Sequence, residues 1–253
     1  MKRLLCILLS LGMLCGCGTA VESKDAASSQ EPVSYSCRVM DYYDYAAPVP
    51  YSEDADDSYY DSTLFAGDSR MGSLYLYGTH KNAQIEYVTS LNLLLIDTMP
   101  LDNHEDGATL MDVLQSTDKK NIYLLFGINE IRNQNFDAFN AEYQDIVNML
   151  RQNDPDVNIY IILSYHPRQV SGLSDDQLSA QLQMMNGGLI DLAMNNHVYY
   201  LDTDNGLDDD GGKIREEFVF DGLHFNPEGA HAFEDYIAKH TVRSENYVKE
   251  VCE

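Results

Sequence analysis

The sequence predicts a three-layer α/β/α domain, in which a doubly wound parallel β-sheet lies between two layers of helices. Short apolar runs alternate along the chain with segments whose apolar residues have helical spacing. The runs are apolar at nearly every position, as strands buried on both faces of a sheet are. Helix-length segments between the runs allow right-handed crossovers between parallel strands. With 253 residues, the chain fits one domain with appendages.

Apolar runs predict the strands, and periodic segments predict the helices between them. The strands are expected at residues 64–66, 84–89, 121–126, 157–163 and 198–201. The helices are expected around residues 110–114, 136–150, 174–189 and 226–237. Ser174 and Gln177 form a capping box at the start of the third helix, and Asn226 precedes Pro227 at the start of the last.

The first twenty residues differ from the rest of the chain. A basic start at Lys2 and Arg3 precedes an apolar run and then small residues, a pattern typical of secretory signals. The run is too short to span a bilayer. Residues 14–17 (LCGC) resemble the lipobox of bacterial lipoproteins, which implies that residues 1–16 are removed and Cys17 is lipidated. The alternative is ordinary secretion. We expect an extracytoplasmic protein that is held to the bacterial cell membrane by its lipid anchor alone.

Residues 17–58 are expected to form a polar tether rich in Asp and Tyr, and residues 59–253 the folded domain. The tyrosines of the tether either stack on sugars or belong to a spacer that packs partly against the domain, and we favour the spacer. Cys37 and Cys252 remain in the mature chain. The sequence leaves open whether they form a disulfide or stay as two free thiols.

Charge and composition exclude several classes of function. The chain has 16 Lys and Arg against 41 Asp and Glu, which argues against a nucleic-acid partner. The acidic residues at 208–210 lack the spacing of an EF-hand, so we interpret them as a solvated loop. No cluster of Cys and His has the spacing of a zinc site. We expect neither a metal nor an organic cofactor.

Polar motifs follow two of the predicted strands and precede the last helix. They read GDSR at residues 67–70, GINE at residues 127–130 and DGLH at residues 221–224. In doubly wound folds, ligands bind at the carboxyl ends of the strands, so these motifs are expected to meet there. Each motif alone also fits a turn or a helix cap.

Together, the motifs supply the groups that acyl transfer needs. Ser69 is a candidate nucleophile, and His224 is a base suited to neutral pH. Asp221 can orient that histidine, and Asn129 can donate to the oxyanion that develops. The three-residue step between Asp221 and His224 lets both side chains converge within one short loop.

These motifs resemble those of the SGNH (GDSL) hydrolases over about residues 60–240. The resemblance implies a flavodoxin-like, single-domain serine esterase. It also implies that Ser69 is the nucleophile, that Asp221 and His224 are the acid and base, and that Asn129 and the Ser69 N–H form part of the oxyanion hole.

The sequence departs from the family pattern at three positions. Ser90 is the best match for a glycine that usually supplies a further oxyanion donor, and Glu130 replaces an aspartate. Arg70 replaces the leucine of the motif; it can bind an anionic substrate group or form an ion pair, and we favour the ion pair. We regard Arg70, Gly127 and His166 as candidates for the substrate pocket.

The sequence therefore predicts a monomeric serine esterase that hydrolyses a small acyl ester, with O-acetyl groups on carbohydrate as the expected substrate. Two alternatives stay open. One is an O-acyltransferase that passes the acyl group to a sugar, and the other is a carbohydrate-binding lipoprotein that keeps the fold without catalysis.

Overall fold

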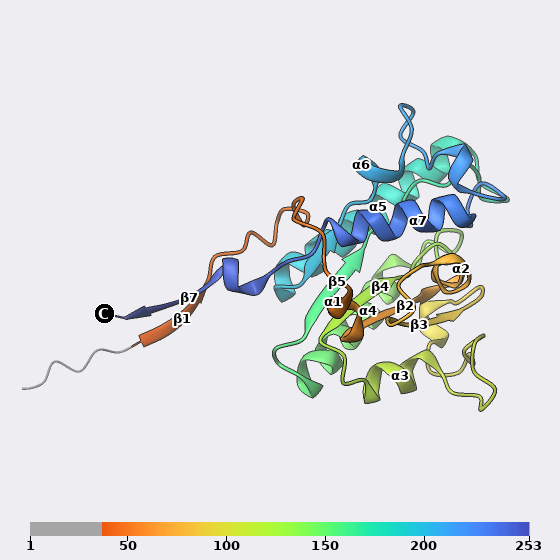
Figure 1. Ribbon diagram of the computed structural model, residues 1–253. Helices are drawn as coiled ribbons and strands as arrows, with labels where there is room; N and C mark the ends of the chain where they lie inside the picture. Colours follow the sequence, from red (N-terminus) through yellow and green to blue (C-terminus); the bar gives the residue numbers. More distant parts are fainter. Residues whose placement is uncertain (1–36, 253) are drawn as a thin grey trace, which may run out of the picture. The chain divides into compact units, whose positions relative to one another are not determined.

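The structure is a computed structural model that describes residues 37–252 (Figure 1). The predicted signal segment 1–16 and the lipidation site Cys17 lie outside the described residues. The described chain forms two compact units, residues 37–38 with 251–252, and residues 39–250. No helix between residues 37 and 252 is both long and apolar enough to cross a membrane.

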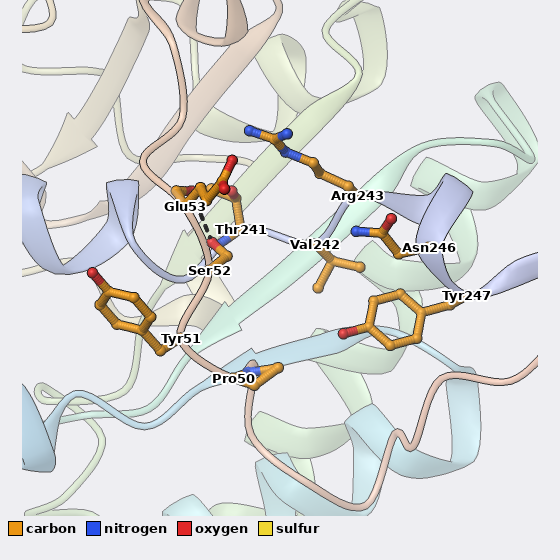
Figure 2. Close-up of a pocket in the computed structure, with 9 residues that line it drawn as sticks. All are labelled: Pro50, Tyr51, Ser52, Glu53, Thr241, Val242, Arg243, Asn246 and Tyr247. Atoms are coloured by element: carbon orange, nitrogen blue, oxygen red, sulfur yellow. Dashed lines mark hydrogen bonds between the residues drawn. The ribbon is translucent and has the colours of Figure 1, made fainter.

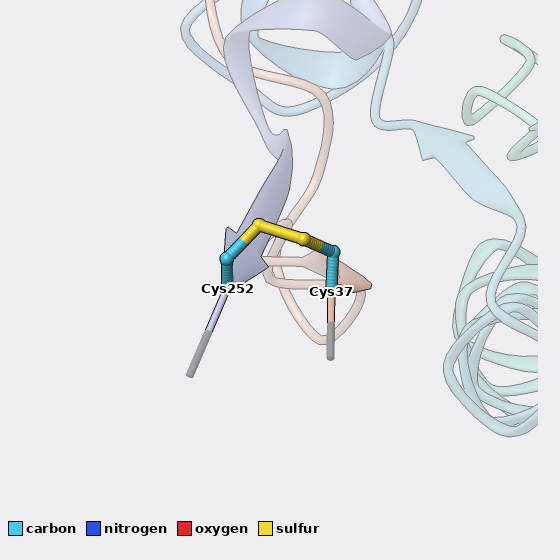
Figure 3. The surroundings of a disulfide bond; sticks show 2 residues. All are labelled: Cys37 and Cys252. Atoms are coloured by element: carbon cyan, nitrogen blue, oxygen red, sulfur yellow. A yellow bond between two sulfur atoms is a disulfide. The ribbon is translucent and has the colours of Figure 1, made fainter. Parts of the chain in front are cut away.

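Cys37 and Cys252 form a disulfide within the smaller unit (Figure 3). The two cysteines stand on strands β1 (Cys37–Asp41) and β7 (Val248–Cys252), which pair as a two-stranded sheet. The bond joins positions that are 215 residues apart in the sequence. A cross-link over so long a segment restricts the unfolded chain strongly.

A five-stranded parallel sheet forms the centre of the larger unit, in the order β3-β2-β4-β5-β6 (Figure 1). The chain first places β3 on one side of β2 and then crosses to place β4 on the other side. The gap between the ends of β2 and β4 is therefore the switch point at which doubly wound folds bind ligands. The strands are β2 (Thr63–Asp68), β3 (Gln84–Val88), β4 (Asn121–Leu125), β5 (Asn158–Ile162) and β6 (Tyr199–Leu201).

Helices cover both faces of the sheet, which confirms the predicted three-layer fold. Strand β4 shows the two faces: Ile122 and Leu124 belong to the core under α3, α4 and α5, whereas Tyr123 and Leu125 belong to the core under α1, α2 and α7. The longer helices are α2 (Ser69–Tyr77), α3 (Leu110–Ser116), α4 (Phe136–Asn153), α5 (Asp175–Asn196) and α7 (Pro227–Ala238). The short ones are α1 (Asp57–Asp61), α6 (Asp204–Leu207) and the 3-10 turns η1 (Leu93–Leu95), η2 (Glu216–Phe218) and η3 (Ser244–Asn246).

The structure contains the two helix N-terminal caps that the sequence predicts. Ser174 and Gln177 form a reciprocal capping box at the start of α5. Asn226 caps α7 by accepting a hydrogen bond from the Gly229 N–H at 3.0 Å, with Pro227 as the first helical residue.

Part of the Tyr-rich segment packs on the domain, in keeping with the favoured spacer interpretation. Tyr43 is buried, and its ring contacts Tyr199 and Tyr247 edge to face with centroids 4.9 and 5.0 Å apart. Tyrosine rings bury a large apolar area although the segment reads as polar. Tyr43 therefore belongs to the packed structure and is not available to stack on a sugar.

The same segment closes a small pocket of about 200 Å³ against the chain that follows α7 (Figure 2). The pocket is lined by Pro50, Tyr51, Ser52, Glu53, Thr241, Val242, Arg243, Asn246 and Tyr247. None of the site residues predicted from the sequence lies there.

Candidate active site

Ser69 stands where strand β2 gives way to helix α2. The Asp68 carboxylate caps this helix by accepting a hydrogen bond from the Arg70 N–H at 3.0 Å. Ser69 is the first helical residue, a position at which the backbone N–H has no partner within the helix. A Cβ at Gly67 would come within 2.7 Å of the Leu125 carbonyl oxygen, so the glycine lets β2 lie close to β4 just before the serine.

The structure brings three of the predicted catalytic residues together. Ser69 Oγ lies 2.9 Å from His224 Nε2, and His224 Nδ1 lies 2.7 Å from Asp221 Oδ2. The serine follows β2, whereas the other two residues come from the turn before α7. The His224 side chain is 36% exposed, so this hydrogen-bonded chain can be reached from solvent.

Asp221 also fixes its own turn. Its Oδ1 accepts hydrogen bonds from the backbone N–H groups of His224 at 2.8 Å and Leu223 at 3.1 Å. Burial raises the pKa of Asp221, but these hydrogen bonds and the His224 ring outweigh burial, and the pKa lies below its usual range. The ionised carboxylate accepts from Nδ1–H of His224. The Nε2 lone pair then faces the serine hydroxyl and can take its proton.

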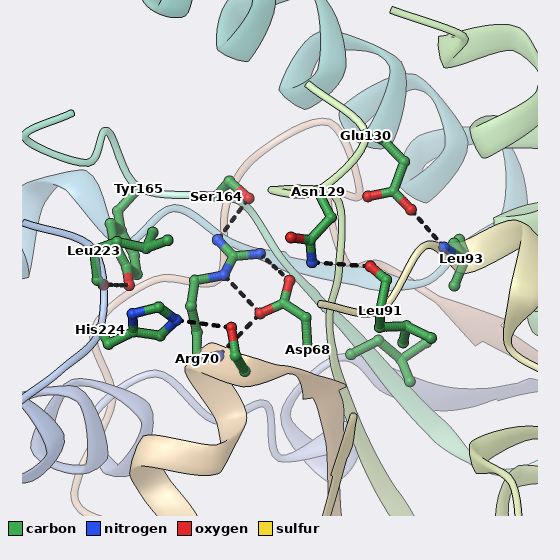
Figure 4. A network of polar contacts seen from close by, with 12 residues as sticks. Asp68, Arg70, Leu91, Leu93, Asn129, Glu130, Ser164, Tyr165, Leu223 and His224 are labelled. Carbon is green, nitrogen blue, oxygen red and sulfur yellow. Dashed lines mark hydrogen bonds and ion pairs between the residues drawn. The ribbon is translucent and has the colours of Figure 1, made fainter. Parts of the chain in front are cut away.

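The loops after β3 and β4 place the predicted oxyanion donors. Asn129 Nδ2 donates one hydrogen bond to the Leu91 carbonyl at 2.9 Å, which leaves its second N–H free (Figure 4). Among residues 37–252, no group accepts from the backbone N–H of Ser90. Ser90 has a φ of +60°, a conformation that favours glycine, and the family glycine is expected at this position.

Glu130 joins the same two loops. Its Oε1 accepts a hydrogen bond from the Leu93 N–H at 2.5 Å (Figure 4). The side chain is buried, and this burial raises the pKa of Glu130 to about 7 despite the Leu93 hydrogen bond. Glu130 therefore ties the loop that carries Ser90 to the loop that carries Asn129.

We expect Glu130→Gln to stabilise the protein at pH 8 by about 1–3 kcal/mol, with the gain vanishing near pH 4. The folded-state pKa lies above the ordinary value of 4.5, so the folded protein binds the proton more tightly than the unfolded chain. The wild-type protein therefore loses stability as the pH rises from about 4 to about 7. Gln keeps a carbonyl oxygen for the Leu93 N–H without the charge. Urea unfolding at pH 4 and pH 8 measures the difference, with the exposed Glu217→Gln as the matched control. A Glu130→Gln variant less stable than wild type at pH 8 would contradict the assignment.

Arg70 does not line a substrate pocket; it is fully buried in the ion pair that we favoured. Its Nε and Nη2 donate to the two Asp68 oxygens at 2.9 and 2.7 Å, and Nη1 donates to Ser164 Oγ at 2.8 Å (Figure 4). Burial lowers the pKa of Arg70, but the Asp68 carboxylate outweighs it and raises the pKa above its ordinary value. The guanidinium holds the strand end that precedes Ser69.

Gly127 and His166, the other two pocket candidates, also have structural roles. Gly127 has a φ of +113°, and a Cβ there would come within 2.5 Å of Met185 Sδ. His166 Nδ1 lies 2.8 Å from the Pro167 carbonyl, and Nε2 lies 2.8 Å from Ser179 Oγ. One ring nitrogen is therefore engaged within the loop that follows β5, and the other contacts helix α5.

A pocket of about 770 Å³ opens beside Asp221 and Leu223. The loops after β3 and β4 contribute Ser90, Ile128, Asn129 and Arg132 to its wall. The loop that follows β5 contributes Gln169, Val170, Ser171, Gly172 and Leu173. Sequence reasoning pointed to this loop through His166 but missed the residues that line the pocket. Near Ser69, the described part of the chain groups no three His, Cys, Asp or Glu side chains closely enough to share one ion.

Comparison with known families supplies the identity of the fold and the class of activity. The model of the GDSL-like lipase/acylhydrolase family matches residues 94–232, more than half of the chain. The match includes Asn129, Asp221 and His224, and Ser69 precedes it. The chain belongs to the GDSL-like lipase/acylhydrolase family. It is therefore a serine hydrolase of the carboxylic ester class.

Solved structures show the same fold. A GDSL-like lipase from Bacteroides thetaiotaomicron is 11% identical with a TM-score of 0.54, over 74% of this chain and 89% of that one. An acetylxylan esterase from Geobacillus stearothermophilus is 11% identical with a TM-score of 0.51, over 72% of this chain and 94% of that one. At such identity the likeness confirms the fold of this GDSL-like protein. No curated protein matches the sequence.

Proposed function

We propose that this GDSL-like acylhydrolase removes O-acetyl groups from carbohydrate through an acyl-enzyme on Ser69. The observation that carries the proposal is the hydrogen-bonded chain from Ser69 Oγ through His224 to Asp221, with distances of 2.9 and 2.7 Å. A serine hydroxyl becomes a competent nucleophile when such a base takes its proton.

The proposed reaction has two steps. Ser69 Oγ attacks the ester carbonyl carbon while its proton moves to His224 Nε2, and Asp221 stabilises the imidazolium that forms. The N–H groups of Ser69 and Ser90 and the side chain of Asn129 donate to the oxyanion. The C–O bond to the sugar then breaks, and the sugar oxygen takes the proton from His224. Water repeats the attack with the same base, and acetate leaves.

We infer that the acyl group is small. Ser90 brings a side chain to a position where the family carries glycine, and hydrogen bonds to Asn129 and Glu130 fix the loop around it. The large, partly polar pocket beside Asp221 suits a carbohydrate better than a long acyl chain. The acetylxylan esterase with the same fold is consistent with this substrate class. On this proposal the enzyme acts outside the cytoplasm, held by a lipid on Cys17.

We expect the full-length protein to release acetate from O-acetylated xylo-oligosaccharides and to prefer p-nitrophenyl acetate over the butyrate by at least about tenfold in kcat/KM. Two methylene groups that do not fit a small acyl site lower kcat/KM by about tenfold or more. Acetate release and initial rates on both esters measure the preference, with Ser69→Ala as the blank. A preference for butyrate, or no release of acetate, would count against a carbohydrate acetylesterase.

A further inference from the structure

The pocket beside Asp221 contains a cation that has no acidic partner. Arg132 lies three residues after Asn129, is exposed, and makes neither a hydrogen bond nor an ion pair among residues 37–252. The sequence has 41 acidic residues for 16 Lys and Arg, so acidic partners are abundant. Five other cations of the described residues have one: Arg70, Lys120, Arg168, Lys213 and Lys239. Among the residues that line this pocket, Arg132 is the one Lys or Arg, so it is the cation that a ligand there would meet.

Two neutral side chains of the pocket wall also have no hydrogen-bond partner within the described part of the chain. Gln169 and Ser171, from the loop after β5, make no side-chain hydrogen bond within the described part of the chain. The acid that lines the pocket, Asp221, is bound to His224 and to its own turn. The pocket therefore offers one free positive charge with two free hydrogen-bonding groups.

We propose that Arg132 binds an anionic oxygen group, a carboxylate or a phosphate, on the alcohol part of the ester. This inference rests on the proposed function, because an acetyl group carries no charge and the anion must then belong to the sugar. The guanidinium has the fork geometry that binds such groups through two hydrogen bonds. The rest of the protein repels anions, with a formal net charge of -25, so an anionic substrate needs a local cation beside the catalytic residues. Acetylated acidic sugars should therefore be hydrolysed faster than acetylated neutral sugars.

The test compares an anionic ester with a neutral ester of the same shape on the full-length protein. The pair is 4-acetoxybenzoate and its methyl ester, and the measured quantity is the ratio of their kcat/KM values. The intrinsic reactivity of the two esters is the same for every variant, so a change in the ratio reports binding. A third ester, 4-acetoxyphenyl phosphate, separates a sugar phosphate from a sugar carboxylate as the source of the anion.

Arg132→Gln is expected to lower the ratio of anionic to neutral ester by about 10- to 100-fold, the size of a charge-assisted contact. Lys81→Gln is the matched control, because it removes one positive charge from an exposed turn outside the pocket and should leave the ratio unchanged. Inhibition by the product 4-hydroxybenzoate should weaken in Arg132→Gln and not in Lys81→Gln.

Two results would overturn the anion subsite while the esterase stands. One is an unchanged ratio in Arg132→Gln. The other is an equal fall of the ratio in both variants. In each case the Ser69-dependent release of acetate from methyl 4-acetoxybenzoate would be retained. A wild-type protein that hydrolyses none of the three esters would overturn the proposed function and the subsite together.

Discussion

Ser69→Ala is expected to lower kcat for p-nitrophenyl acetate by about 10⁴-fold or more. The variant keeps the pocket and the oxyanion donors but loses the atom that forms the acyl-enzyme. His224 Nε2, 2.9 Å from the hydroxyl in the wild-type protein, would then have no proton to take. Initial rates at pH 7.5 measure the loss, and urea unfolding shows whether the fold is kept.

The double variant provides the sharper control. Ser69 and His224 act on one proton, so Ser69→Ala combined with His224→Ala should lose little more than either change alone. If the fold losses in kcat of the two single variants multiply in the double variant, the two residues act separately. Ser69→Ala with more than a tenth of the wild-type kcat would contradict a nucleophilic role for this serine.

Arg70→Met is expected to destabilise the protein by about 3–5 kcal/mol. The Arg70 side chain is 0% exposed and that of Asp68 is 1% exposed, so the change leaves a buried carboxylate without its counter-charge. Two hydrogen bonds to Asp68 and one to Ser164 disappear as well. Urea unfolding at pH 7 measures the loss of stability.

Asp68→Asn combined with Arg70→Met tests the cause of that loss. Asn caps helices about as well as Asp, and the double variant removes both charges of the buried pair. It should therefore be more stable than Arg70→Met alone. A double variant as unstable as the sum of the two single variants would show that the ion pair is not the source of the effect.

Much of the fold could be predicted because its strands are short apolar runs between periodic segments. The predicted ranges 121–126 and 157–163 contain β4 and β5, and the caps at Ser174 and Asn226 mark the starts of two helices. For the segment before α1, the sequence favoured a spacer that packs partly on the domain, but it could not say which of its tyrosines are buried. Tyr43 shows the reason: its ring is buried although its neighbours are acidic.

The convergence of the catalytic residues could be predicted from the sequence, because the order of the strands decides where the motifs meet. The carboxyl ends of β2 and β4 lie at the switch point of the sheet, so residues after them converge. The residues that line the pocket could not be predicted from the sequence. Arg132 and Gln169 belong to loops without a pattern, and which loop side chains face a cavity depends on packing. Arg70 was ambiguous for the same reason, since only burial decides between substrate and ion pair.

Labelling with a fluorophosphonate tests most directly whether Ser69 is the activated nucleophile. Such reagents modify serines whose hydroxyl is activated by a neighbouring base. Intact mass and peptide mapping of the full-length protein should show one phosphonyl group per chain, on Ser69, and none in His224→Ala. Absence of labelling, or labelling of another residue, would contradict the assignment of Ser69, His224 and Asp221 as one catalytic unit.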